Sequence, residues 1–182
     1  MICKQTPLND CFIIEPKVFE DERGSFFETF NSKDFKKNTG LDIVFVQDNQ
    51  SISQYGTIRG LHFQEGEFAQ AKLIRVAKGE VLDVVVDMRP NSSTYLKQFS
   101  YLLSGENNHQ LFVPRGFAHG FTSLSNEVVF DYKCDNFYNK ASESGIVFND
   151  KALNIDWKIP KDDQIVSEKD QNLPSLDAYL KL

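Results

Sequence analysis

The sequence predicts a single all-β domain, folded as a sandwich or a barrel, and three observations point to this class. The chain contains 16 phenylalanines and 6 tyrosines, and aromatic residues suit the half-buried surface of a pleated sheet. Short strand-like runs recur along the chain and are separated by turn-forming residues. Helix signals are few, and a length of 182 residues favours one domain spanning 1–182.

The predicted strands follow one another from the N-terminus, with turn-forming residues between them. The runs are 11–19 (CFIIEPKVF), 43–47 (IVFVQ), 70–76 (QAKLIRV), 80–88 (EVLDVVVDM), 95–103 (YLKQFSYLL), 110–114 (QLFVP) and 127–134 (EVVFDYKC). In the third run, Lys72, Ile74 and Val76 share one face, because side chains alternate across a sheet. Gly79 links this run to the fourth, so the two predict a hairpin.

Two short helices complete the predicted elements. Residues 31–40 begin with an Asn-Ser pair that can cap a helix and end with Gly40, a common stop signal. Residues 175–182 (SLDAYLKL) predict a second helix at the C-terminal end. An all-β domain has to cover its sheet edges, and pairing of two copies into a dimer is one way to do so.

Composition excludes several classes of protein. The net charge is −6 and Lys and Arg form no dense cluster, so nucleic acid is not an expected partner. No apolar run approaches the ~20 residues of a membrane helix, and the first residues do not resemble a signal peptide. Three cysteines without a CxxC pair fit a reduced, cytoplasmic protein. A few arginines can still hold a small phosphorylated ligand.

The stretch RGLHFQ (59–64), together with LFVPRGFAHGF (111–121), resembles a cupin-type jelly-roll barrel. Metal-binding cupins carry a His-x-His pair, and later a histidine in a Pro-x-Gly-x-x-His setting. Pro114, Gly116 and His119 match the later part, but Gln64 stands where the second ligand of the first pair would be. Glutamine is a poor ligand for transition metals, so we expect no metal site. The third histidine, His109, is expected to be a solvated loop residue.

Polar residues on inward-facing strand positions suggest a catalytic cavity. Tyr132 shares its face with Val128 and Phe130, and Lys72 shares its face with apolar neighbours. Burying an unpaired ammonium is costly, so an inward lysine is more informative than an inward tyrosine. A histidine, a lysine and a tyrosine in one cavity suit proton transfer beside a carbonyl group, where a cation stabilises the enolate.

An ordered set of motifs resembles the dTDP-4-dehydrorhamnose 3,5-epimerase family over nearly the whole chain. The matching stretches are 19–30, 45–64, 69–89, 111–121, 131–138, 143–150, 155–157 and 166–170. The resemblance implies conversion of dTDP-4-dehydro-6-deoxy-D-glucose to dTDP-4-dehydro-β-L-rhamnose, by inversion of C3 and C5 beside the C4 ketone. No cofactor is expected. The product usually serves a lipopolysaccharide, a cell wall or another bacterial glycan.

The resemblance also implies roles for individual residues. His62 matches the catalytic base, and Asp170 matches the carboxylate that holds this histidine in place. Tyr132 matches the proton donor on the opposite face of the sugar, and Lys72 matches the group near the C4 oxygen. The expected substrate-binding residues are Arg23 and Arg59 for the diphosphate, Gln47, Asn49 and Glu28 for the nucleotide or sugar, Phe26 and Tyr138 for the base, and His119 and Glu143.

The resemblance further implies a homodimer in which the N-terminal segment, including Phe19, reaches the neighbouring site. Three alternatives remain open from the sequence. The first is an epimerase that acts on another nucleotide sugar or inverts C3 alone. The second is a metal-dependent cupin enzyme, and the third is a sugar-binding barrel without catalytic activity.

Overall fold

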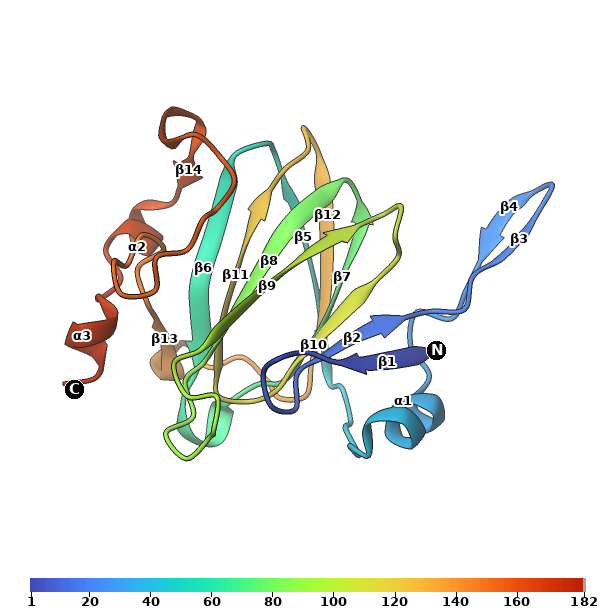
Figure 1. The fold of residues 1–182 in the computed structure, drawn as a ribbon, viewed down its shortest axis with the longest axis horizontal. Helices are drawn as coiled ribbons and strands as arrows, with labels where there is room; N and C mark the ends of the chain where they lie inside the picture. Colours follow the sequence, from blue (N-terminus) through green and yellow to red (C-terminus); the bar gives the residue numbers. More distant parts are fainter. Residues whose placement is uncertain (182) are drawn as a thin grey trace.

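The computed structural model describes residues 1–181 and confirms a cupin-like jelly roll, in which two sheets face each other (Figure 1). The first sheet has the order β1-β2-β10-β7-β12-β5, formed by Ile2–Gln5, Phe12–Glu15, Gln110–Val113, Lys72–Lys78, Val128–Cys134 and Gln47–Ser53. The second has the order β13-β6-β11-β8-β9, formed by Glu143–Gly145, Thr57–Gln64, Phe117–Ser123, Glu80–Asp87 and Gln98–Ser104, with β14 (Ile165–Val166) parallel to β6.

The remaining elements lie at the edges of the barrel. A separate hairpin, β3 (Phe19–Asp21) with β4 (Gly24–Phe26), projects away from it (Figure 1). The helices are α1 (Ser32–Thr39), α2 (Glu168–Gln171) and α3 (Leu176–Tyr179), and short 3-10 turns cover Gly66–Phe68, Lys140–Ser142 and Lys161–Asp163. No helix within residues 1–181 is long and apolar enough to cross a membrane.

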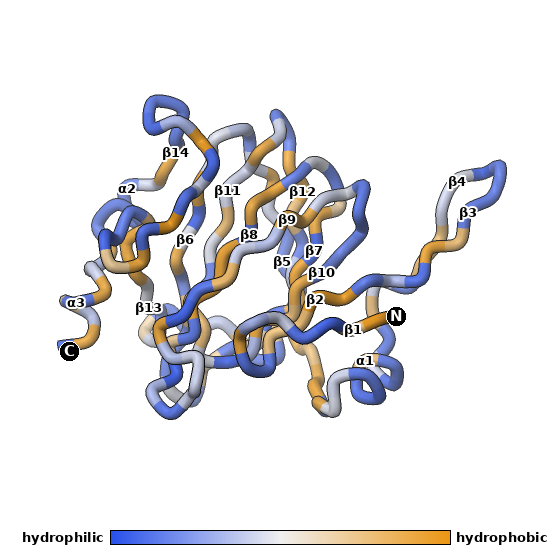
Figure 2. The backbone as a smooth tube through the Cα atoms, viewed as in Figure 1, coloured by the Kyte–Doolittle hydropathy of each residue, from blue (hydrophilic) through white to orange (hydrophobic). Residues whose placement is uncertain are grey.

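The core between the two sheets is made of alternate residues from facing strands. Ile74 and Val76 of β7, Val85 of β8 and Phe130 of β12 belong to one buried cluster. Figure 2 shows this pattern as hydrophobic segments along the strands, whereas the tip of the β3–β4 hairpin is hydrophilic. Because one face of each strand fills the barrel, polar residues placed on that same face have to share the interior with this core.

The outer side of β6 is covered by the C-terminal part of the chain. Leu61 and Phe63 pack there with Ile146, Trp157 and Leu176 in a second buried cluster. Strands β13 and β14 also pair with β6, and α2 lies against it (Figure 1). Since neighbouring side chains of a strand point in opposite directions, this anchoring turns the intervening residue toward the barrel interior.

The hairpin predicted around Gly79 is wrong. Strands β7 and β8 follow each other directly, but β7 pairs with β10 and β12, whereas β8 pairs with β9 and β11. A single residue with φ of 79° joins them, which is a left-handed conformation that glycine adopts readily. The link is shorter than a two-residue hairpin loop, so the chain turns a corner from one sheet to the other instead of folding back.

The helix prediction at residues 31–40 is confirmed. The side chain of Asn31 accepts hydrogen bonds at the start of α1, and Gly40 ends it with φ of 75°. The predicted strand 43–47 is wrong, because the strand β5 begins only at Gln47. Its apolar residues, such as Phe45, instead pack around Phe35 of α1, which explains the apolar run without a sheet.

The last predicted helix is shorter than expected, and His109 differs from its prediction. Only Leu176–Tyr179 are helical, after a capping Ser175, and residue 182 lies outside the described residues. His109 is half-buried instead of solvated, because its Nδ1 lies 2.8 Å from the hydroxyl of Tyr101.

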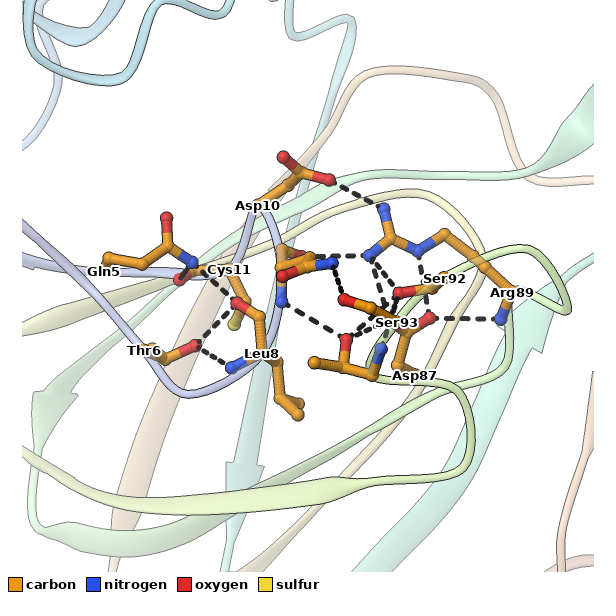
Figure 3. A network of polar contacts seen from close by, with 11 residues as sticks. Gln5, Thr6, Leu8, Asp10, Cys11, Asp87, Arg89, Ser92 and Ser93 are labelled. Atoms are coloured by element: carbon orange, nitrogen blue, oxygen red, sulfur yellow. Dashed lines mark hydrogen bonds and ion pairs between the residues drawn. The ribbon is translucent and has the colours of Figure 1, made fainter.

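A polar network holds the N-terminal loop against the end of β8 (Figure 3). The buried carboxylate of Asp87 accepts hydrogen bonds from Arg89, Ser92 and Thr94, at distances of 2.6 to 2.9 Å. Arg89 also binds the carboxylate of Asp10 at 2.9 Å. Burial raises the pKa of Asp87, but these hydrogen bonds outweigh it, so the pKa lies below its ordinary value. The network therefore favours the charged carboxylate.

Candidate active site

A cavity of about 730 Å³ is the place where most of the predicted site residues meet. Strands β5, β6, β7, β11, β12 and β13 contribute to its wall, together with α2. The predicted residues that border it are His62, Tyr132, Asp170, Lys72, Gln47, Asn49, Arg59, His119, Tyr138 and Glu143. The cavity is thus lined by cationic, phenolic and amide groups, a chemistry suited to a polar anionic ligand.

His62 and Asp170 form a hydrogen-bonded pair at this cavity. The Nε2 atom of His62 lies 2.8 Å from Oδ1 of Asp170. Asp170 belongs to the short helix α2, whose first turn is capped by Ser167. The second carboxylate oxygen, Oδ2, accepts the backbone N–H of Gly60 at 3.0 Å. The carboxylate is therefore fixed from two sides, and it fixes the imidazole ring in turn.

The surroundings of Asp170 favour its charged form. Burial raises its pKa, but the hydrogen bonds from His62, from the Gly60 backbone and from Ser167 outweigh burial and bring the pKa below its ordinary value. An anionic partner can stabilise the imidazolium that forms when the ring takes up a proton. Since Nε2 faces this carboxylate, Nδ1 is the ring nitrogen that remains for a ligand in the cavity.

Gly60 permits the close approach of two strands beside this pair. Its φ is 118°, and a Cβ atom there would lie 2.6 Å from Cα of Gly120 on β11. The register between β6 and β11 shifts at this point, next to the directly opposed residues His62 and His119. The glycines therefore allow an irregularity that sets two histidines side by side on the cavity wall.

Tyr132 and Lys72 come from the opposite sheet. Burial raises the pKa of Tyr132, so the phenol keeps its proton at neutral pH. The Nζ atom of Lys72 lies 5.9 Å from the centre of the Tyr132 ring. Within residues 1–181 neither the phenol oxygen nor this ammonium has a hydrogen-bond partner. Both groups are therefore free to contact a ligand.

The buried carboxylate of Asp83 was missed by the sequence reasoning. It lies on β8 with no exposed surface, and its Oδ2 is 2.9 Å from Nε2 of His119. A signal for it existed, because Asp83 and Asp87 alternate with the buried Val81 and Val85 on one face of β8. A carboxylate at such a position needs a partner inside the barrel.

Several contacts hold polar groups at the rim of the cavity. Arg59 donates to Oγ of Ser53 at 3.2 Å. The hydroxyl of Tyr138 donates to Glu143 at 3.1 Å, and Nζ of Lys169 lies 2.5 Å from the other oxygen of the same carboxylate. Lys169 was also missed, although it directly precedes Asp170 in the sequence. Next to Tyr138, the amide of Gln47 donates to Asn49 at 2.9 Å and accepts the backbone N–H of Tyr138 at 3.1 Å.

Three predicted binding residues lie outside the cavity of their own chain. Arg23 and Phe26 belong to the projecting β3–β4 hairpin, and Glu28 follows it (Figure 1). Arg23 is paired with Asp21 at 2.6 Å, and Phe26 is 69% exposed. Phe19, on the same hairpin, is 54% exposed. The hairpin is not packed on the barrel, so it brings none of these side chains to the residues described above.

The side chain that replaces the second cupin metal ligand has another partner. Gln64 is buried, and its Oε1 accepts the backbone N–H of Asn139 at 2.8 Å. Among residues 1–181, no group of three or more His, Cys, Asp or Glu side chains is arranged to hold a metal ion. The two cavity histidines are each bound to a carboxylate through Nε2 instead.

Comparisons with known proteins identify the family of the chain. The family model for dTDP-4-dehydrorhamnose 3,5-epimerase matches residues 5–178. A curated relative of that name from Methanothermobacter thermautotrophicus is 50% identical over 169 residues, which covers 92% of this chain and 90% of the relative. A crystal structure of the epimerase from Elizabethkingia anophelis NUHP1 is 59% identical, with a TM-score of 0.93 and 96% of both chains covered.

A further solved structure carries a ligand. It is the enzyme from Legionella pneumophila Philadelphia 1 in complex with dTDP-4-keto-L-rhamnose, which is 43% identical with a TM-score of 0.92. The match covers 96% of this chain and 92% of that one. Because the family model matches residues 5–178 and relatives of the same name cover more than nine-tenths of the chain, the chain is an epimerase that belongs to the dTDP-4-dehydrorhamnose 3,5-epimerase family.

Proposed function

We propose that the protein converts dTDP-4-dehydro-6-deoxy-D-glucose to dTDP-4-dehydro-β-L-rhamnose without a cofactor. The observation that carries this proposal is the His62–Asp170 pair, which borders the same cavity as Tyr132 and Lys72. The pair supplies a base, the phenol an acid and the ammonium a cation. These three groups are what an inversion beside a ketone requires.

Each inversion would proceed through an enolate. Nδ1 of His62 removes the proton from the carbon beside the ketone, the electron pair of the C–H bond forms a double bond to C4, and the π pair of the C4 carbonyl moves to its oxygen. Lys72 stabilises this oxygen, and Asp170 stabilises the imidazolium. The phenol of Tyr132 then returns a proton to the other face of the carbon, and the C4 carbonyl forms again. Solvent restores both protonation states before the second centre reacts.

The substrate-binding roles follow the chemistry of the rim. Arg59 is suited to the diphosphate, because guanidinium groups match phosphate oxygens. Gln47 and Asn49 offer amides to the nucleotide, and Tyr138 offers a ring that is 51% exposed for stacking on the base. His119 and Glu143 would contact the sugar end of the ligand.

We also propose that the working form is a homodimer in which the β3–β4 hairpin enters the cavity of the neighbouring copy. This would give Phe19, Arg23, Phe26 and Glu28 a ligand to bind. The exposure of both phenylalanines on a hairpin that leaves its own barrel supports the proposal (Figure 1). The exposed pair would be costly to leave in water, whereas a neighbouring copy would cover it.

Mixed dimers can test this arrangement. A His62→Ala chain and an Arg23→Ala chain, each weakly active alone, would form mixed dimers after joint refolding. If the hairpin acts on the neighbouring copy, one cavity of each mixed dimer has both defects and the other has none, so activity returns. If the hairpin serves its own barrel, every cavity keeps one defect, and activity does not return.

The remaining expectations describe the setting of the enzyme. We propose a single catalytic domain over residues 1–182 that works in the cytoplasm and supplies a bacterial glycan. Three free cysteines, of which Cys11 and Cys134 are buried, suit a reducing compartment.

Deuterium incorporation from D2O tests the reaction itself. Wild-type protein should give a product with deuterium at C3 and C5 and both centres inverted, as read by NMR. His62→Ala should abolish incorporation, whereas Asp156→Asn, an exposed carboxylate paired with Lys158, should retain it. Deuterium and inversion at C3 alone would replace the proposal by a C3 epimerase. Activity lost in EDTA would support a metal enzyme, and no turnover of any 4-ketosugar would support a binding module.

A further inference from the structure

Asp83 is a buried carboxylate directly behind the cavity wall that the proposed reaction leaves without a role. It accepts a hydrogen bond from Nε2 of His119, and its other oxygen, Oδ1, has no partner although it is buried. Most buried polar atoms in proteins are hydrogen-bonded, so an orphaned carboxylate oxygen calls for an explanation.

The contrast with Asp170 shows how unusual this carboxylate is. Asp170 is held by the ring of His62 and by the backbone N–H of Gly60, one donor on each oxygen. Asp83 has one donor only, and burial, its largest influence, raises its pKa. The hydrogen bond from His119 and the charge of Lys72 oppose burial only in part, so the pKa of Asp83 lies above its ordinary value. The negative charge of Asp83 therefore depends on a cation in the cavity.

Lys72 is the complementary group. Its side chain is half-buried, and within the described chain its Nζ has neither a hydrogen bond nor an ion pair. Burial holds its pKa below the ordinary value, and the nearby Cys134, Asp83 and Glu143 oppose this effect only in part. Glu143 already holds Lys169 and Tyr138, and burial raises the pKa of Cys134 to about 11, so this thiol is neutral. Asp83 is thus the carboxylate acting on Lys72 that is buried and not already paired with a lysine.

The remaining titratable groups around Asp83, Lys72 and His119 do not change the net charge of these three residues. Those that face Asp83, Lys72 and His119 are His62 on β6, Tyr132 and Cys134 on β12, Glu143 on β13 and Cys11 before β2. His62 is already matched by Asp170, and the thiols and the phenol are neutral at pH 7. An anionic Asp83, a neutral His119 and a cationic Lys72 sum to zero charge, which suits a buried site.

We propose that Asp83 is a positioning residue that keeps Lys72 protonated from behind the cavity wall and fixes the tautomer of His119. Asp83 accepts the Nε2–H of His119, so Nδ1 of this ring carries a lone pair and can accept a sugar hydroxyl. Its negative charge offsets the ammonium, so the enzyme holds the enolate-stabilising cation ready before substrate arrives. The inference rests on the proposed function only for the use of that cation.

The variant Asp83→Asn tests the inference through the pH dependence of turnover. Without the negative charge, burial acts on Lys72 unopposed by Asp83, so the pKa of Lys72 falls. The alkaline limb of kcat should then move to lower pH by about one unit or more, because kcat needs the ammonium form. KM for the dTDP-sugar should change little, because the amide oxygen of the variant can still accept the Nε2–H of His119 and keep the tautomer of that ring.

Asp87→Asn is the matched control. Asp87 is equally buried on the same face of β8, but its partners are Arg89, Ser92 and Thr94 at the end of the strand. This variant should lower thermal stability and leave the alkaline limb in place. An alkaline limb that is the same in Asp83→Asn as in Asp87→Asn would overturn the inference.

A ligand-free NMR titration tests the effect of Asp83 on Lys72 even if no epimerisation occurs. The 13Cε signal of Lys72, assigned by its loss in Lys72→Met, should titrate at lower pH in Asp83→Asn than in the wild type. An unchanged titration would refute the role of Asp83, whatever the activity. A shifted titration without turnover would instead refute the proposed function alone.

Discussion

Replacing Asp170 by asparagine changes one carboxylate oxygen to an NH2 group. The hydrogen bonds of this carboxylate determine how the ring of His62 responds. The backbone N–H of Gly60 can only donate, and it now points at Oδ2 from 3.0 Å. The single oxygen of the asparagine will therefore face Gly60, which turns the NH2 group toward Nε2 of His62. That nitrogen has to become an acceptor, so the proton of the ring moves to Nδ1.

The consequence for catalysis is large because Nδ1 is the proposed base. A protonated Nδ1 cannot take a proton from the sugar, and the imidazolium also loses its anionic partner. The same substitution in a serine-protease triad lowers kcat by about 10⁴ through the wrong tautomer. We expect a similar loss, roughly 10³- to 10⁴-fold, equal to about 4–5 kcal/mol of transition-state stabilisation.

Turnover is measured by coupling the product to an NADPH-dependent reductase specific for the L-sugar, with dTDP binding as a check of the folded site. Asp150→Asn is the matched control, because this buried carboxylate accepts backbone N–H groups of Leu153 and Leu176 away from the cavity. The control should lose stability but keep kcat. A loss below tenfold in Asp170→Asn, with dTDP binding intact, would refute the tautomer reasoning.

Two further predictions concern the acid of the site and the stability of the fold. Tyr132→Phe should lower turnover by about 10²- to 10⁴-fold while His62 still exchanges substrate protons with D2O, so NMR should show deuterium without inversion. Inversion at the wild-type rate would contradict the donor role. Asp87→Asn should lower the free energy of unfolding at pH 7 by roughly 2 kcal/mol, measured by urea denaturation. The pKa of Asp87 is lowered in the folded state, so its contribution is present above pH ~4 and lost as the pH falls through the lower folded value. The stability difference between wild type and variant should therefore shrink in acid, and a difference that grows there would contradict the assignment.

The sequence was sufficient where local patterns decide the structure. Alternation along residues 127–134 correctly turned Tyr132 inward, and the caps at Asn31 and Gly40 correctly bounded α1. The sequence was insufficient where the structure depends on which strands pair with each other. A glycine between two strand-like runs looks like a hairpin turn, but the pairing of β7 and β8 with other strands sends Gly79 around a corner. Apolar runs such as 43–47 likewise do not reveal whether they pack in a sheet or under a helix.

The site could be predicted from the residues only in part. His62, Lys72 and Tyr132 stand out as polar residues on apolar strand faces. Asp170 lies in a charged loop sequence, and only the family resemblance singled it out before the structure showed it buried beside His62. Asp83 had a local signal in the alternation of β8, but its histidine partner lies on β11, 36 positions away. Contacts of that range follow from topology, which local patterns do not encode.

The C-terminal part of the chain both covers the outside of β6 and carries Asp170 to its inner side. Docking of this C-terminal part on β6 and assembly of the reactive centre are therefore one event. A barrel whose last segment has come loose would keep the walls contributed by the other strands and still present them to a sugar nucleotide, but its histidine would lack the carboxylate. Such a barrel is a receptor for the ligand, and docking of the C-terminal part turns the receptor into a catalyst.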